Sequence, residues 1–235
     1  MQLFYNININ ETTENFYFDK EESKHIIKVL RKKDTDILYV TNGLGLLFKT
    51  EITLASDSKC TVKIISFEKS ATPKFHLHLA VAPTKMNDRF EWFLEKATEI
   101  GIHEITPIIC DRSERKVINA ERFEKILLTA MKQSNVLFLP KLNNAVSFKE
   151  FLKQKQQGLN FIAHCEETDK KTLKTALKPN ENVTILIGPE GDFTEKEIEL
   201  ALDSNYIPVS LGNTRLRTET AAIVACHSVV FVNEN

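Results

Sequence analysis

The stretch Val183-Thr184-Ile185-Leu186-Ile187-Gly188-Pro189-Glu190-Gly191-Asp192-Phe193 decides the fold. Its five apolar or β-favouring residues lead into a glycine-bearing turn, and the following Thr194 and Glu197 have the spacing of a capping box that begins a helix. A buried strand, a tight turn and a helix form the repeating unit of α/β folds, whose ligands bind at the carboxyl ends of the strands. Taken alone, the turn fits equally well a plain strand-to-helix connection, in which the helix N-terminus favours Glu190.

A second stretch of the same kind is Leu211-Gly212-Asn213-Thr214-Arg215-Leu216-Arg217-Thr218-Glu219-Thr220-Ala221. It lies between a predicted strand and an apolar segment, residues 220–232. Charges at the start of a buried helix need partners, because unpaired buried charges are costly. Two interpretations stay open: a salt-bridged helix start with Thr218 as N-cap, or a site in which Arg217 or Glu219 faces a substrate.

Outward from these loops, strands and helices alternate through residues 73–235, which favours a parallel sheet covered by helices. The predicted strands are 75–82, 105–109, 161–163, 183–187 and 207–211, and the predicted helices are 88–100, 120–134 and 220–232. Gly101 stops the first of these helices. The last helix is apolar almost all round, so we expect both of its sides to be buried, against the sheet or a partner subunit.

Residues 1–72 have a different sequence pattern, with short runs of β-favouring residues at 37–40, 46–48, 49–54 and 61–65. Asn42-Gly43 is a hairpin signal between two of these runs. One helix, 23–31, interrupts the strands, with Asp19 as N-cap and Glu22 completing a capping box. The sequence therefore predicts two domains, a small β-barrel-like domain over 1–72 and an α/β domain over 73–235.

Composition limits the class of protein. Hydrophobic residues make up 42% and charged residues 27%, which is typical of a globular protein, and the net charge of −1 excludes general polyanion binding. No run is long enough to cross a membrane and no signal peptide is visible, so we expect a cytoplasmic protein. The four cysteines are far apart, which predicts free buried thiols and no metal site. His76 and His78 are expected on the less buried face of an edge or outer strand.

The two loops together resemble the signature of the RsmE family of 16S ribosomal RNA methyltransferases, which belongs to the SPOUT superfamily. The family's G-P-E-G-G loop corresponds to residues 188–192, and its L-G-x-x-x-L-R-T-E-T-A segment to residues 211–221. Four further landmarks follow the family in order and spread the resemblance over the whole chain: His25 to Arg31, Lys96 to Gly101, Ser113-Glu114-Arg115, and Gln133-Ser134. Two departures stand out: Asp192 replaces the second glycine, and Asn135-Val136 stands where the family often has an arginine.

The resemblance implies a PUA-like RNA-binding domain followed by a SPOUT methyltransferase domain with a C-terminal trefoil knot. It also implies a homodimer that uses S-adenosylmethionine to methylate N3 of one uridine in 16S rRNA of the small ribosomal subunit. The implied donor-binding residues are Ile187, Gly188, Pro189, Glu190, Gly191, Leu211, Gly212, Leu216, Arg217 and Thr218. Because the imide nitrogen must lose a proton, a cation near the uracil oxygens would stabilise the developing anion. Arg217 is the candidate for that catalytic role, with Glu219 orienting it.

RNA contacts must come from local patches, since residues 1–72 are electrically balanced. The candidate basic residues are Lys24, Lys28, Arg31, Lys32 and Lys33, extended by Arg89, Arg112 and Arg115 in the second domain. The first group also fits an ordinary solvated helix face. Two other functions stay open: a SPOUT methyltransferase with another target, such as a ribose 2′-hydroxyl or a tRNA base, and a non-catalytic RNA-binding assembly factor.

Overall fold

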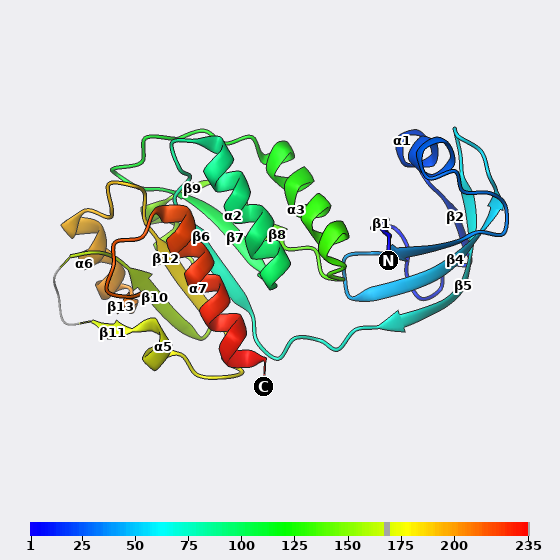
Figure 1. The fold of residues 1–235 in the computed structure, drawn as a ribbon. Helices are drawn as coiled ribbons and strands as arrows, with labels where there is room; N and C mark the ends of the chain where they lie inside the picture. Colours follow the sequence, from blue (N-terminus) through cyan, green and yellow to red (C-terminus); the bar gives the residue numbers. More distant parts are fainter. Residues whose placement is uncertain (167–169, 235) are drawn as a thin grey trace. The chain divides into compact units, whose positions relative to one another are not determined.

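The computed structural model describes residues 1–166 and 170–234 (Figure 1). The chain forms two compact units. The first comprises Met1–Thr72 and Met131–Leu139, and the second comprises Pro73–Ala130 and Pro140–Asn235. The first unit thus takes in a short later segment as well as residues 1–72. The domain boundary between residues 72 and 73 stays a prediction.

The first unit contains a five-stranded sheet with the order β1-β3-β4-β5-β2. Its strands are β1 (Leu3–Tyr5), β2 (Asn15–Tyr17), β3 (Ile37–Thr41), β4 (Leu46–Leu54) and β5 (Thr61–Lys69). Strands β3 and β4 pair antiparallel around Asn42-Gly43, where Gly43 has a φ of +73°, so the hairpin prediction is confirmed. One continuous strand, β4, replaces the two runs expected over residues 46–54. Alternate β4 residues face a core that includes Phe48 and Ile52.

The helix of the first unit begins and ends earlier than expected and changes type. Helix α1 covers Lys20–Lys24 and continues as a π-helical turn, η1, over His25–Val29. Asp19 is the N-cap as predicted, because its carboxylate accepts a hydrogen bond from the Glu22 backbone N–H at 2.8 Å. The Glu22 side chain does not complete the capping box; it contacts His25 Nδ1 and Lys132 Nζ instead.

The second unit contains an eight-stranded sheet with the order β11-β13-β10-β12-β6-β7-β8, and β9 also pairs with β7. Its strands are β6 (Leu77–Val81), β7 (Glu104–Ile109), β8 (Lys141–Leu142), β9 (Val146–Ser147), β10 (Leu159–Ala163), β11 (Lys171–Thr172), β12 (Val183–Ile187) and β13 (Ile207–Ser210). All of these pairs are parallel, so the predicted α/β fold is confirmed. The trefoil knot stays a prediction.

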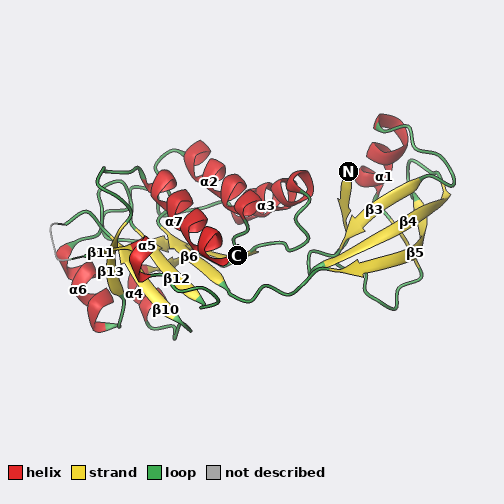
Figure 2. Cartoon of the chain, turned by 60° about the horizontal axis from the view of Figure 1, so that its bottom comes forward, coloured by secondary structure: helices red, strands yellow, loops and turns green. Residues whose placement is uncertain are grey.

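Helices cover both faces of this sheet (Figure 2). They are α2 (Asn87–Ile100), α3 (Ala120–Ser134), α4 (Phe148–Leu152), α5 (Leu173–Ala176), α6 (Glu195–Asp203) and α7 (Thr218–Asn233). Helix α7 packs on α2, β6 and β12. One of its sides is buried, at Ala222, Cys226 and Val229, whereas Phe231 is 61% exposed. The expectation that both sides are buried therefore does not hold within a single chain. Among the described residues, no helix is long and apolar enough to span a bilayer.

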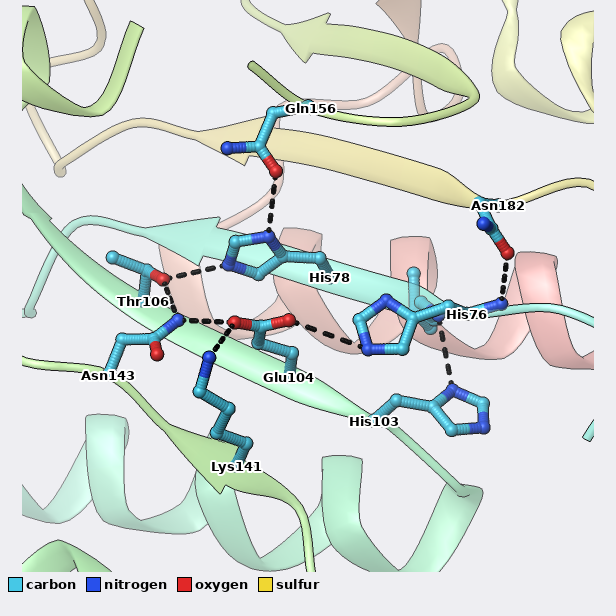
Figure 3. Close-up of polar contacts among 10 residues, drawn as sticks. His76, His78, His103, Glu104, Thr106, Lys141, Asn143, Gln156 and Asn182 are labelled. Carbon is cyan, nitrogen blue, oxygen red and sulfur yellow. Dashed lines mark hydrogen bonds and ion pairs between the residues drawn. The ribbon is translucent and has the colours of Figure 1, made fainter. Parts of the chain in front are cut away.

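Strand β6 is central, which corrects the expectation of an outer strand for His76 and His78. It lies between β12 and β7 (Figure 3), and the burial of the two rings differs: His78 is buried and His76 is half-exposed. Thr106 Oγ1 lies 2.7 Å from His78 Nε2 and Gln156 Oε1 lies 3.4 Å from Nδ1. Because the Gln156 oxygen only accepts, a neutral His78 carrying its proton on Nδ1 satisfies both contacts. Burial lowers the pKa of His78 and keeps this form.

His103, at the start of β7, is a second histidine held neutral. Its Nδ1 accepts a hydrogen bond from the Leu77 backbone N–H at 3.1 Å. Burial, assisted by the nearby His76, lowers the pKa of His103 to about 4. Protonation removes this acceptor, so the uncharged ring is part of the native packing.

We expect acid to destabilise the second unit through these histidines. A histidine whose pKa is lower in the folded chain takes up its proton first in the unfolded chain, so its stabilising effect is complete above about pH 6.5 and is lost as the pH falls toward 4. His103→Asn keeps an acceptor near the Nδ1 position but does not titrate. Urea unfolding measures the free energy of unfolding at pH 7 and at pH 4.5. The fall between these two pH values should be smaller in the variant than in the wild-type protein, by roughly 1 kcal/mol. Equal falls in both proteins would contradict the assignment.

Candidate functional site

Three adjacent parallel strands, β13, β10 and β12, end at the same edge of the sheet. The segments that follow them line two hollows of about 420 and 290 Å³. The larger lies between the ends of β10 and β13, and the smaller between the ends of β10 and β12. Shared walls join them, from Ala163, Cys165, Arg215, Leu216 and Ala221. This volume and position suit a small-molecule ligand.

The loop after β12, residues 188–194, is shaped by two special positions. A Cβ on Gly188 would lie 3.1 Å from the Phe193 ring, so this position is tight for any larger residue. Asp192 has a φ of +62°, the left-handed conformation for which glycine is suited. Aspartate tolerates it because a short polar side chain can bond locally: Oδ1 accepts from the Phe193 N–H at 2.8 Å, and Oδ2 from the Cys165 N–H at 2.7 Å. The departure from glycine thus adds a bond to the β10 loop.

The helix after this loop begins as predicted. Thr194 Oγ1 accepts from the Glu197 N–H at 3.3 Å, and Glu197 Oε2 accepts from the Thr194 N–H at 2.8 Å, which is a complete capping box. Glu190 lies earlier in the turn. Its Oε1 accepts from the Lys85 N–H at 2.9 Å and so ties the loop to the segment between β6 and α2.

Arg112 and Arg115, expected to contact RNA, also bond to backbone carbonyls around this loop. Arg112 Nη1 donates to the Gly191 and Phe193 carbonyls at 2.9 and 3.2 Å. Arg115 Nε donates to the Thr84 carbonyl at 3.1 Å, and its Nη2 donates to the Lys85 carbonyl at 2.8 Å. Both guanidinium groups therefore hold the loops in place, and their contact with RNA stays a prediction.

The loop after β13, residues 211–217, is joined to the first loop by Thr218, whose Oγ1 donates to the Gly188 carbonyl at 3.1 Å. Thr218 is the first residue of α7 rather than its N-cap; Arg217 is the N-cap, with no side-chain capping bond. Arg215 and Arg217 are exposed, whereas Glu219 is buried. In the part of the chain that the structure describes, the ion pair of Glu219 is with Arg89, at 3.9 Å, and not with Arg217.

The loop after β10 supplies site residues that sequence reasoning missed. His164 is 6% exposed and lines the larger hollow. Neither ring nitrogen has a hydrogen-bond partner within residues 1–166 and 170–234. Burial and the nearby Lys170 lower the pKa of His164, which favours the neutral ring with one donor and one acceptor. Cys165 is exposed, contrary to the expectation of a buried thiol. The only sequence signal was their position at the end of a predicted strand.

The basic residues of the first unit lie together on α1, η1 and the turn that follows. Four of the five are exposed, and Lys32 is half-buried. Lys28 pairs with Asp57 at 3.2 Å, which reduces its free charge. Within the described residues, no group of three or more His, Cys, Asp or Glu side chains is arranged to hold a metal ion.

Comparisons with known proteins agree with this architecture. Residues 71–230 match the model of an RNA methyltransferase domain, and residues 18–65 match that of an RNA methyltransferase PUA domain. The ribosomal RNA small subunit methyltransferase E of Buchnera aphidicola is 33% identical over 221 residues, covering 89% of this chain and 85% of that protein.

Two solved structures have the same fold over nearly the whole chain. A protein of Porphyromonas gingivalis described as a probable rRNA-methyltransferase is 36% identical, with a TM-score of 0.90 and coverage of 99% of this chain and 98% of its own. A Legionella pneumophila methyltransferase in complex with SAM is 28% identical, with a TM-score of 0.85 and coverage of 97% and 96%.

The Asp192 bonds generate a stability prediction. Asp192→Ala keeps a Cβ in the left-handed region and removes two hydrogen bonds, so it should lower the unfolding free energy by about 2 kcal/mol. Asp192→Gly removes the bonds but relieves the backbone strain, so its loss should be smaller. Urea denaturation of both variants measures the order. A larger loss for glycine than for alanine would contradict the strain that we assign to this position.

Proposed function

This chain belongs to the ribosomal RNA small subunit methyltransferase E family, and from that premise we propose that it transfers a methyl group from S-adenosylmethionine to N3 of one uridine in 16S rRNA. The joined hollows at the ends of β10, β12 and β13 carry this proposal. Their walls combine polar and apolar residues of two glycine-bearing loops and of the loop after β10. They include His164, whose ring nitrogens have no hydrogen-bond partner among the described residues. A ligand with both polar and apolar parts fits such a lining.

S-adenosylmethionine would supply an electrophilic methyl group on a sulfonium. The residues proposed to hold it are those of the two loops, Ile187 to Gly191 and Leu211 to Thr218, together with His164. The neutral ring of His164 can donate one hydrogen bond and accept another, which suits a purine edge or a ribose hydroxyl. Because methyl transfer is an in-line displacement, fixing donor and acceptor in place supplies much of the rate.

Arg217 lies in the wall between the donor hollow and open solvent. It lines the 290 Å³ hollow and is exposed on its other side. A guanidinium in this position can face the oxygens of an incoming uracil and stabilise the negative charge that develops as N3 loses its proton.

The PUA-type first unit supports RNA as the partner, with the α1–η1 patch (Lys24, Lys28, Arg31, Lys32 and Lys33) as the proposed phosphate contact. We also propose a homodimer in which the uncovered side of α7, including Phe231, contacts a second copy of the chain. The reaction would take place in the cytoplasm on the small ribosomal subunit.

The reaction itself is the first test. Purified protein with radiolabelled S-adenosylmethionine and small subunits from cells lacking the gene should place label in N3-methyluridine at one 16S position. Arg217→Ala should lower the single-turnover rate by about 10²-fold, in the range for removal of one stabilising group. Lys125→Ala, which removes an exposed cation of α3 that lines none of the hollows, is the control. Label in a ribose or in tRNA would move the acceptor; absence of both label and donor binding would support the RNA-binding alternative.

The basic patch has a separate test. Lys32→Ala with Lys33→Ala should weaken binding to rRNA at low salt and make the slope of log affinity against log salt shallower by about 1 to 2, because fewer counterions are released. Lys174→Ala with Lys178→Ala, two lysines outside the patch, is the control. Filter binding between 50 and 300 mM salt measures the slope. An unchanged slope would remove the patch from the RNA interface.

A further inference from the structure

A third hollow opens beside the loop after β13, outside the donor site described above. Its volume is about 730 Å³ and it is broad and open. Its lining residues come from α2 and from the start of α7 with the preceding loop: Asp88, Arg89, Trp92, Arg215, Leu216, Arg217, Glu219 and Thr220. Arg215, Leu216 and Arg217 also line the 290 Å³ hollow, so one short segment separates the two spaces. A group in the third hollow would therefore lie next to the donor.

The Glu219 carboxylate is the chemically unusual feature of this hollow. Only 6% of the residue is exposed. Oε2 has no hydrogen-bond partner among the described residues, and Oε1 is 3.9 Å from Arg89 Nε, too far for a hydrogen bond. A buried carboxylate without a donor is costly, which indicates that a ligand supplies one. The terminal torsion of glutamate is soft, so a small rotation turns either oxygen toward the hollow.

Trp92 adds an aromatic surface on the other side. It is 46% exposed on α2, one turn from the half-exposed Arg89, and it is the single tryptophan of the chain. An exposed aromatic ring beside arginines is the usual platform on which an unstacked base rests. An enzyme that modifies an atom within a base must take that base out of its stack. The charged lining makes this hollow a poor seat for an apolar segment.

We propose that this hollow holds the flipped target uracil, with Trp92 stacked on the ring and the Glu219 carboxylate as the acceptor of the N3 proton. This inference rests on the proposed function. Arg89 and Arg217 face the two carbonyl oxygens. As the N3 lone pair bonds to the methyl carbon, the carbon–sulfur bond breaks and its electron pair stays on sulfur. The N3 proton passes to Glu219 and is later released to solvent, which restores the carboxylate.

The proton-accepting role is tested with Glu219→Gln at saturating S-adenosylmethionine. The single-turnover rate on small subunits should fall by about 10² or more, as for loss of a general base, while calorimetry shows donor binding within threefold of wild type. On small subunits reconstituted with 5-fluorouridine-containing 16S rRNA, the rate defect of this variant should be at least tenfold smaller, because fluorine makes N3 more acidic. Glu121→Gln, an exposed glutamate of α3, is the control. A defect of equal size on both substrates would overturn the role of Glu219.

The stacking role is tested by comparing a variant that keeps an aromatic ring at position 92 with one that has an aliphatic side chain there. Trp92→Phe should keep the apparent KM for small subunits within about threefold, whereas Trp92→Leu should raise it roughly tenfold with donor affinity unchanged. An unchanged KM in Trp92→Leu overturns the role of Trp92 as a stacking platform. A change in the molar mass of the purified protein in this variant also overturns it, because Trp92 is then assigned to a contact between protein subunits. If the wild-type protein methylates no uridine at all, the proposed function itself fails, and the roles of Trp92 and Glu219 fail with it.

Discussion

The second unit depends on one constraint: loops at the end of a parallel sheet carry backbone donors and acceptors that no strand can satisfy. Here the loops satisfy one another. Thr218 donates to the Gly188 carbonyl, Asp192 accepts from Cys165, and Glu190 accepts from Lys85. These bonds join four segments that are far apart in sequence. Because these bonds hold the loops to one another, the hollows between the strand ends are already formed. Ligand binding and methyl transfer both need such preorganisation.

Charged side chains line the hollows on both sides of residues 215–217. On the donor side, Lys170, Glu190 and Asp192 are among the lining residues, and the buried His164 is held neutral. On the other side, Arg89, Arg217 and the buried Glu219 stand close to an exposed tryptophan. Arg215 and Arg217 line the spaces on both sides, so a guanidinium of this segment is available to an anion that develops next to the donor. The arrangement thus matches the charge change of the reaction.

Much of this could be predicted where local signals and tertiary packing agree. Strand β12 and helix α3 match their predicted bounds residue for residue. A short apolar run defines the strand, and Asn119 Oδ1 accepts from the Arg122 N–H at the start of the helix. Prediction failed where a long-range contact decided the outcome. His78 lies at alternating spacing, as on an outer strand, yet Thr106 and Gln156 satisfy its ring in the interior. His164 follows a short strand with no glycine turn, so nothing local distinguished it. Arg112 resembles a free surface cation, although two distant carbonyls hold it.

The position of Asp192 shows how a family motif can change without loss of its geometry. A left-handed residue there needs either glycine or a side chain that compensates locally. Aspartate meets the need with two backbone donors, one from the β10 loop. That second bond connects the end of β12 to the end of β10, the two strands that flank the smaller hollow. The substitution therefore exchanges backbone freedom for a hydrogen bond between the walls of the proposed donor site, and it ties the β10 loop, which contains His164, to the loop after β12.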